Sequence, residues 1–139
     1  MNSNNNFIID LGTWVAGDLP SIGTLPVTGT ATYTGHAIGS VVNGLHRYTA
    51  VGSYAMSWDF ASMSGNTSII NFDVRSFSGT ATASNGRDFT GALSGSGVSG
   101  TLAGSFFKGG GDPAAEAGGQ FGVSNGSNYA AHGTFAARR

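Results

Sequence analysis

The sequence contains no cysteine, three prolines, a single lysine and few charged residues of either sign. Without cysteine, the chain can form neither a disulfide framework nor a thiolate metal site. Charged residues make up 9 % of the 139 residues, and the formal net charge is −1. Such a chain has no basic field to attract nucleic acid or an anionic membrane surface. No segment approaches the ~20 consecutive apolar residues that a membrane-spanning helix requires.

Glutamate, lysine and leucine, which helical bundles use heavily, are also scarce, whereas glycine, serine, threonine and asparagine are abundant. Glycine contributes 24 of the 139 residues, more than twice its usual share of ~7 %. Aromatic residues reach 11 %, which is too many for a disordered tail. These proportions indicate one all-β domain with much glycine inside its strands.

The first part of the chain differs from the rest. Residues 1–6 are polar after the methionine and lack the charge and apolar core of a signal peptide, so they predict a linker. We therefore expect the chain to be the C-terminal part of a longer protein. Residues 1–27 are predicted to form a lead-in segment with one short strand near 7–16, and residues 28–139 are predicted to form a β-barrel domain.

From residue 28 onward, apolar or small residues alternate with polar ones, as in strands that bury one face. Within 46–60, for example, Tyr54, Met56 and Trp58 share one face. Turn signals such as Asn-Gly separate successive runs. The predicted strands are 29–42, 46–60, 67–75, 77–84, 87–94, 98–107, 118–124 and 128–136.

Short connections between these strands predict an antiparallel meander, and an open meander would leave two exposed edges that closure removes. Glycines within the strands lie two positions from an aromatic residue on the same face, as Gly104 and Phe106 do. Such glycines let a strand coil while a ring covers the bare backbone. The prediction is an all-β fold: a closed antiparallel up-and-down β-barrel of about eight strands with a short N-terminal lead-in.

Large inward-facing residues raise the question of an interior pocket. An eight-stranded barrel is either filled by its own side chains or holds one small ligand. The number of rings favours a filled interior, and a lipocalin-like carrier of a small apolar ligand stays as an alternative. The residues that would line the pocket are Tyr33, Tyr54, Met56, Trp58, Phe72 and Phe106.

Two stretches resemble a known family. The first, over 30–39, contains Tyr-Thr-Gly, and the second runs over 113–121 before a final Gly-Thr-Phe. They resemble the opening strand and the closing motif of the C-terminal β-barrel domains of transferrin-binding protein B and related bacterial surface proteins, among them factor H-binding protein. The resemblance spans about 28–139. It implies structural roles for Pro113, Glu116, Gly118, Gly119, Phe121, Gly133 and Phe135.

The departures from the family narrow what the resemblance implies. Asp112 stands where the family has glycine before the proline, and the long loops, the handle domain and the lipid-anchored cysteine are not found in this sequence. The resemblance therefore implies a non-enzymatic binding or presentation module at the C-terminal end of a bacterial surface or secreted protein. We expect a protein partner, bound through the rims and exposed aromatic residues such as Phe107, and no cofactor.

The third interpretation, an enzyme in the barrel mouth, needs two convergent titratable groups, and the alternation places none there. His36 and His132 face outward and His46 begins an inward series, so no metal site is predicted. Asp112 and Glu116 could be paired carboxylates, but we expect Glu116 to bond backbone and fix the connection before the seventh strand. Expected surface charges are Asp59, the pairs Asp73 with Arg75 and Arg87 with Asp88, and a solvated end at Arg138 and Arg139.

Overall fold

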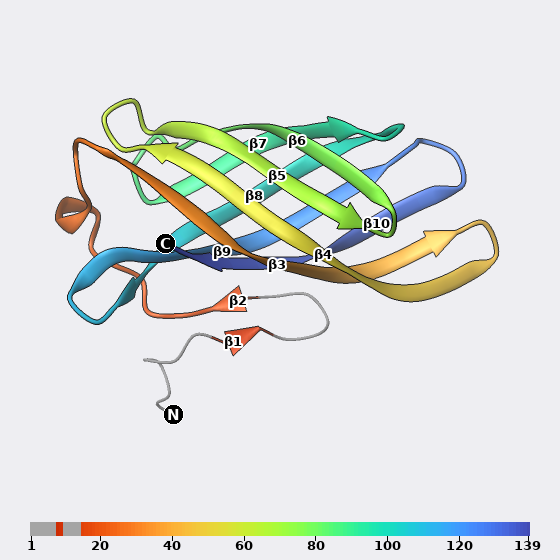
Figure 1. Cartoon of the computed structure of the whole chain (residues 1–139), viewed down its shortest axis with the longest axis horizontal. Helices are drawn as coiled ribbons and strands as arrows, with labels where there is room; N and C mark the ends of the chain where they lie inside the picture. Colours follow the sequence, from red (N-terminus) through yellow and green to blue (C-terminus); the bar gives the residue numbers. More distant parts are fainter. Residues whose placement is uncertain (1–7, 10–14) are drawn as a thin grey trace.

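The alternation that begins at residue 28 produces eight long strands that close into a barrel (Figure 1). The computed structural model describes residues 8–9 and 15–139. The barrel strands are β3 (Thr30–Asn43), β4 (His46–Asp59), β5 (Ser64–Phe72), β6 (Arg75–Thr82), β7 (Asp88–Gly95), β8 (Val98–Gly109), β9 (Asp112–Ser124) and β10 (Tyr129–Arg138).

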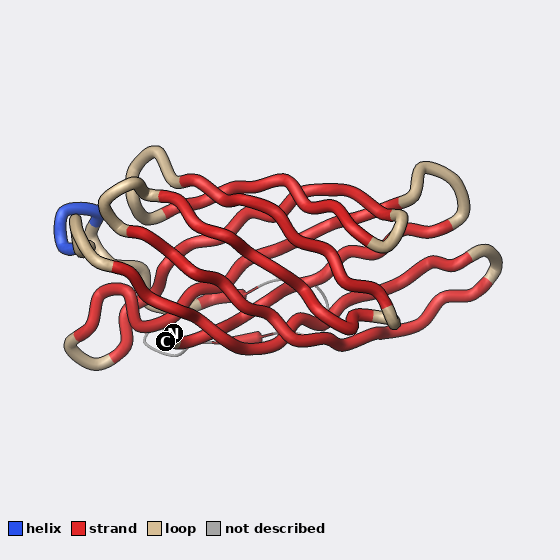
Figure 2. The backbone as a smooth tube through the Cα atoms, turned by 45° about the horizontal axis from the view of Figure 1, so that its top comes forward, coloured by secondary structure: helices blue, strands red, loops and turns tan. Residues whose placement is uncertain are grey.

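Each barrel strand pairs antiparallel with the next, and β10 returns to pair with β3 (Figure 2). The closing ladder runs from Tyr129 opposite Asn43 to Arg138 opposite Thr34, so β10 is paired along its whole length. Its other side pairs with β9. The predicted closed up-and-down barrel of eight strands is confirmed.

The lead-in segment contains more structure than the one short strand expected near 7–16. Two short strands, β1 (Ile8–Ile9) and β2 (Val15–Ala16), pair antiparallel, and a 3-10 turn, η1 (Ile22–Thr24), follows. β2 lies against β9 and β10 on the outside of the barrel (Figure 1). The polar linker predicted over residues 1–6 lies outside the described residues.

The start of β9 corrects the sequence prediction. The run of glycines at 109–111 and Pro113 predicted a flexible connection, with at most one turn of helix over 113–117, and a strand from 118. Instead, Gly109 pairs with Asp112, and the strand begins there. Pro113 is tolerated because it is the second residue of the strand, where the missing N–H interrupts little of the ladder.

The end of β5 also differs from the prediction, which extended that strand to residue 75. A bulge between Ile69 and Phe72 shifts the register of β5 against β6. Asp73 and Val74 then form the turn, with φ of 53° and 56°. Both central residues of a type I′ hairpin turn adopt positive φ, which is uncommon for a β-branched residue such as Val74.

Candidate functional site

The six residues predicted to line an interior pocket all face into the barrel. Each is at most 1 % exposed. The rings of Trp58 and Phe106 meet edge to face with centroids 5.2 Å apart, and Tyr33 lies 5.5 Å from Phe106. Tyr54 stacks on Phe135 at 4.3 Å. The rings therefore occupy the barrel interior and contact one another across it.

The phenols among these rings are hydrogen-bonded, whereas the buried indole N–H of Trp58 has no partner within the described residues. Thr67 donates a hydrogen bond of 2.7 Å to the phenol oxygen of Tyr54, and the phenol of Tyr33 donates one of 2.5 Å to the carbonyl of Ala114. Burial raises the pKa of both phenols well above the ordinary value. Both tyrosines are therefore neutral near pH 7 and serve as anchored parts of the core.

The glycines of the closing motif permit close approach between strands. Gly119 lies opposite Gly104, and Gly133 lies opposite Gly39. A methyl group on Gly133 would overlap the carbonyl oxygen of Ile38. Glycine is thus required there by space.

Phe89 illustrates how aromatic residues cover these glycines. A Cβ built on Gly104, the cross-strand partner of Phe89, would lie 2.9 Å from atoms of its ring. The ring thus covers the bare backbone of the glycine, as predicted for glycine-rich barrel strands.

The acidic residues around Pro113 are held by the C-terminal arginines. Arg138 donates a hydrogen bond of 2.9 Å to Glu116, and Arg139 donates two of 3.0 Å to Asp112. The expected backbone partner of Glu116 is thus replaced by a side chain. Both arginines are exposed, as expected for a solvated chain end, but each is also paired with an acidic residue. The guanidinium of Arg139 holds the pKa of Asp112 below its usual value.

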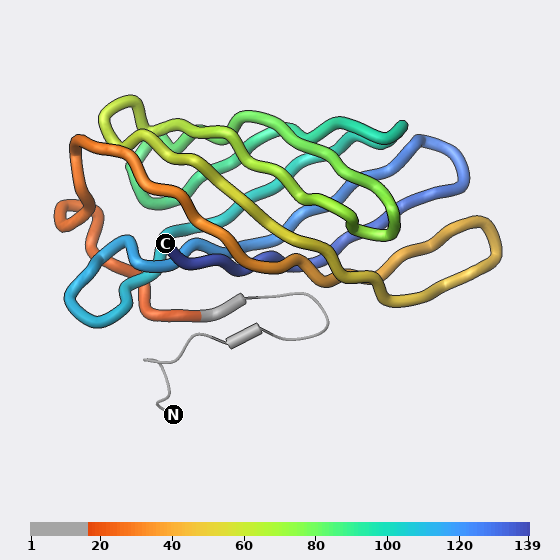
Figure 3. The backbone as a smooth tube through the Cα atoms, viewed as in Figure 1, coloured from red at the N-terminus to blue at the C-terminus, as the bar shows by residue number. Residues whose placement is uncertain are grey.

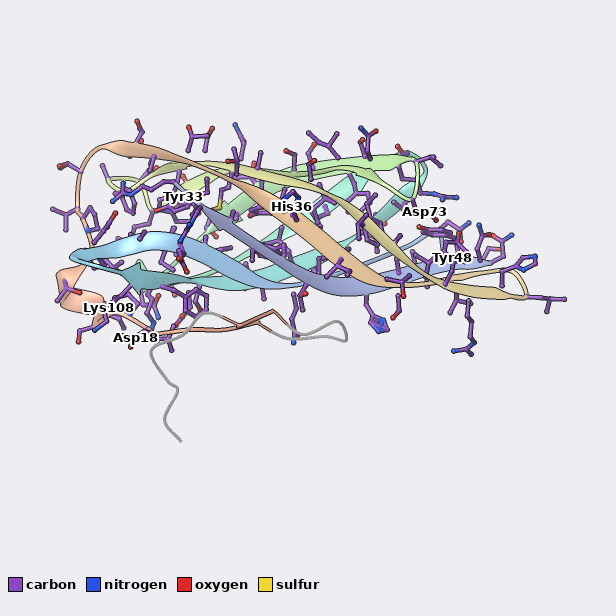
Figure 4. The ribbon with its side chains drawn as sticks, turned by 60° about the horizontal axis from the view of Figure 1, so that its bottom comes forward. Asp18, Tyr33, His36, Tyr48, Asp73 and Lys108 are labelled. Atoms are coloured by element: carbon purple, nitrogen blue, oxygen red, sulfur yellow. The ribbon has the colours of Figure 1, made fainter. Side chains whose placement is uncertain are left out.

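The exposed aromatic residue expected at Phe107 is buried, with 6 % exposure. The lead-in explains this, because the N–H of Lys108 donates a 2.8 Å bond to the carbonyl of Asp18 and its ammonium lies 3.6 Å from the Asp18 carboxylate. Figure 4 shows this pair at one end of the barrel. The alternation correctly placed Phe107 on the outer face, but could not show that another segment runs beside it.

The three histidines are all exposed. His36 and His132 face outward as predicted, whereas the inward position predicted for His46 is wrong because the β3–β4 hairpin extends past the barrel (Figure 2). Within the described residues, no group of three or more acids and histidines could hold a metal ion. No helix in that part of the chain is long and apolar enough to cross a membrane.

The expected surface ion pairs form at opposite ends of the barrel. Arg87 pairs with Asp88 at 3.1 Å, and Arg75 pairs with Asp73 at 3.2 Å. Asp59 accepts hydrogen bonds from the backbone of the turn that follows it, which is a local structural role.

Asp73 belongs to a larger network that joins three hairpins. Its Oδ2 accepts hydrogen bonds from the phenols of Tyr48 and Tyr129, at 2.8 and 2.9 Å, in addition to that from Arg75. The guanidinium of Arg75 lies 3.7 Å from the ring centroid of Tyr129. Burial, followed by the contact with Asp73, raises the pKa of Tyr129 to about 12. The network fixes the β5–β6 turn against β4 and β10.

The same end of the barrel carries exposed apolar side chains. We call residues 42–51 and 70–75 the hairpin rim; they form the β3–β4 hairpin and the β5–β6 turn. Leu45 and Val74, at the two turns, are 100 % and 92 % exposed. An exposed apolar group of this kind is typical of an interaction surface. The other large apolar residues of the rim with exposed side chains are Val42, Tyr48, Val51 and Ile70.

The sequence did not predict the hairpin rim. Tyr48 and Asp73 are 25 positions apart, and Asp73 and Tyr129 are 56 positions apart. Only the closed topology brings them together. A local signal for this turn was Asp73, because aspartate tolerates the left-handed conformation that the turn requires.

No protein-family model matches the chain, and no curated protein sequence matches it. Solved structures do share its architecture. Transferrin-binding protein B from Haemophilus parasuis matches with a TM-score of 0.72 and 21 % identity, over 89 % of this chain and 29 % of that protein. A surface lipoprotein matches with a TM-score of 0.69 and 20 % identity, over 89 % of this chain and 66 % of the lipoprotein.

The haemoglobin receptor HpuA from Kingella denitrificans, solved in complex with human haemoglobin, matches with a TM-score of 0.60 and 22 % identity. The match covers 90 % of this chain and 49 % of HpuA. At these identities the likeness establishes the fold, and the predicted resemblance to the transferrin-binding protein B barrel is confirmed at that level. The chain spans less than a third of the length of transferrin-binding protein B that it matches.

Proposed function

We propose that the domain is a non-enzymatic protein-binding module that contacts its partner through the hairpin rim. One observation carries the proposal: almost fully exposed apolar side chains stand on turns that a partly buried polar network ties together. Leu45 and Val74 expose nearly all of their surface. Asp73, in the same turn as Val74, accepts hydrogen bonds from three side chains. Rigid apolar groups lose little conformational entropy when a partner covers them.

The conformation of Val74 supports the same proposal. A valine with φ of 56° stores backbone strain of about 1–3 kcal/mol. Glycine or asparagine would relieve that strain at an exposed turn, and neither contributes an apolar side chain. A valine here strains the turn and exposes an apolar side chain, which supports a use for that side chain outside the fold.

The ion pairs at the opposite end of the barrel support a structural role for that end. There the charged groups are paired within the chain, as in Asp112 with Arg139 and Asp18 with Lys108. The rings that fill the interior favour a binding surface on the outside of the barrel over an apolar pocket within it, and the buried phenols favour binding over catalysis.

The similar structures suggest the class of partner. Their names describe proteins that bind transferrin and haemoglobin, and one is called a surface lipoprotein. We infer by analogy of fold that this domain works at the cell surface or outside a bacterium, as a terminal module of a longer protein. Its partner is a host protein or another domain of its own parent.

A binding screen tests this proposal. The purified domain is immobilised and exposed in turn to transferrin, haemoglobin, other serum proteins and the remaining domains of the parent protein. Saturable binding to one of these is expected. Failure to bind any of them would contradict the assignment as a protein-binding module.

A further inference from the structure

One edge of β4 is unpaired over residues 46–52. β4 pairs with β3 along its whole length, but its ladder with β5 begins only at Ser53, opposite Ile70. Figure 3 shows the β3–β4 hairpin continuing past the β5–β6 turn. No strand pairs with residues 46–52 of β4 on that side, and we call this open position beside β4 the lane. An unpaired strand edge is a template for pairing with another extended chain.

The direction of the free backbone groups follows from two bonds at the ends of the ladder. Phe60 donates its N–H to the carbonyl of Gly29. Hydrogen-bonded pairs alternate along an antiparallel ladder, so the backbone N–H and C=O groups of the even-numbered β4 residues bond with β3. At the other end, the N–H of Gly44 donates to the carbonyl of Asn128, which directs the even-numbered residues of β3 toward β10 and the odd-numbered ones toward β4. Arg47, Thr49 and Val51 therefore point their N–H and C=O groups into the open lane.

The lane opens beyond Gly52, which still lies against Ile70 and Phe72, because the β4–β5 ladder ends there. The ladder with β4 ends at Ile70; the next residue, Asn71, has φ of 56°, and its N–H donates to the hydroxyl of Ser76 on β6. The bulge between Ile69 and Phe72 turns the strand into the β5–β6 hairpin. Bulges of this kind end strand pairing at a defined position.

The side chains along the lane indicate what fits there. Arg47, Thr49 and Val51 share the outer face of β4; Arg47 is exposed, and Val51 is 62 % exposed. Within the described part of the chain, no ion pair is formed by Arg47. On the inner face, the side chain of Tyr48 reaches Asp73 (Figure 4), which leaves room for small side chains only.

We propose that the open edge of β4 over 46–52 binds an extended segment of a partner protein by strand addition, with an acidic residue beside Arg47 and an apolar residue beside Val51. The proposal rests on the proposed protein-binding function and names the form of the bound segment. Main-chain hydrogen bonds from Arg47, Thr49 and Val51 provide affinity, and the outer-face side chains provide specificity.

The test uses the whole chain, labelled with ¹⁵N, and the capped peptide Ala-Val-Ser-Thr-Ser-Glu-Ala, which places small residues on the inner face. Titration to millimolar peptide should shift the amide signals of Arg47, Thr49 and Val51 and slow their hydrogen exchange severalfold. The matched peptide with lysine in place of glutamate should bind about 1.4- to 5-fold more weakly, the range expected for one exposed charge pair.

Two variants make the test specific. Arg47→Glu, a surface change that keeps the fold, should reverse the preference so that the lysine peptide binds more tightly. Thr49→Pro removes a lane-facing N–H that the β3–β4 ladder does not use, and should abolish the shifts. If Thr49→Pro does not fold, the charge reversal alone decides between specific and non-specific binding.

Three results would overturn the inference. One is the absence of amide shifts at Arg47, Thr49 and Val51 with either peptide. Another is protection of these three amides in the free monomer. The third is a dimer, measured by light scattering, in which the same amides are protected, because the occupant would then be a second copy of the chain. Failure of the serum-protein screen would contradict the protein-binding function without changing these peptide measurements. Failure of strand addition at β4 can therefore be distinguished from failure of the proposed function.

Discussion

The phenol of Tyr48 donates a 2.8 Å hydrogen bond to Oδ2 of Asp73 and thereby ties the projecting β3–β4 hairpin to the β5–β6 turn. Tyr129 reaches the same oxygen from β10. One carboxylate therefore holds three hairpins at the end of the barrel that exposes Leu45 and Val74. The polar groups of the rim are hydrogen-bonded to each other, and its apolar groups face solvent.

Removing the Tyr48 hydroxyl should loosen this link. Tyr48→Phe should lower the free energy of unfolding by about 1 kcal/mol, since one hydrogen bond is lost from a partly exposed site. In urea melts the double variant with Asp73→Ala should be less destabilised than the sum of the two single variants, because both remove the same bond. Strict additivity would show that the bond contributes nothing to stability.

Replacing Val74 by asparagine should stabilise the domain while weakening binding. Val74→Asn relieves the strain of positive φ and should raise the free energy of unfolding by about 1 kcal/mol. The exposed control Val51→Asn, in a β strand with ordinary φ, should not stabilise. Thermal melts followed by circular dichroism compare the two, and an equal effect of both changes would contradict the strain argument.

Alkaline pH should destabilise the domain through Tyr129. Its folded pKa of about 12 exceeds the ordinary value of 10.0, so the folded state holds the phenol proton more tightly. The resulting stability is fully present below pH 10 and is lost as pH rises through 12. Urea melts between pH 9 and 12 measure the fall, and Tyr129→Phe should reduce its slope. An unchanged slope would mean that Tyr129 ionises alike in both states.

Phe121 should be one of the most costly residues to truncate. Its ring is 3 % exposed and meets Phe72 edge to face with centroids 5.3 Å apart. Phe121→Ala should lower the free energy of unfolding by about 3–5 kcal/mol. Val51→Ala, at a residue that is 62 % exposed, is the matched control and should change stability little. Similar losses for the two variants in urea melts would refute the proposed core.

The fold was predictable from the sequence because burial imposes a period of two on every barrel strand. The alternation of Tyr54, Met56 and Trp58 with other residues identified the inward face of β4 from the sequence alone. The same rule placed Phe107 outside correctly, yet its burial depends on residues near Asp18, which no local pattern connects to it. His46 lies on the same side of β4 as the inward-facing residues, but the hairpin extends past the barrel at this point, so its side chain is exposed.

The candidate site was less predictable, because its parts come from distant positions. Asp73 was expected to form a simple surface pair with Arg75, and that pair exists. Its bonds with Tyr48 and Tyr129 require the ring of strands to close, and the bend at Asn71 depends on backbone geometry that asparagine permits but does not dictate. Exposure of Leu45 likewise follows from how far the hairpin projects.

The most direct test of the account is a comparison of partner binding by two charge-introducing variants at opposite ends of the barrel. Leu45→Asp with Val74→Asp alters the hairpin rim, and Val27→Asp alters an exposed residue of the lead-in that is 78 % exposed. Biolayer interferometry with the protein identified in the binding screen should show at least tenfold weaker binding for the rim variant and unchanged binding for Val27→Asp. Unchanged binding by a folded rim variant, or loss only with Val27→Asp, would contradict the assignment of the rim as the binding surface.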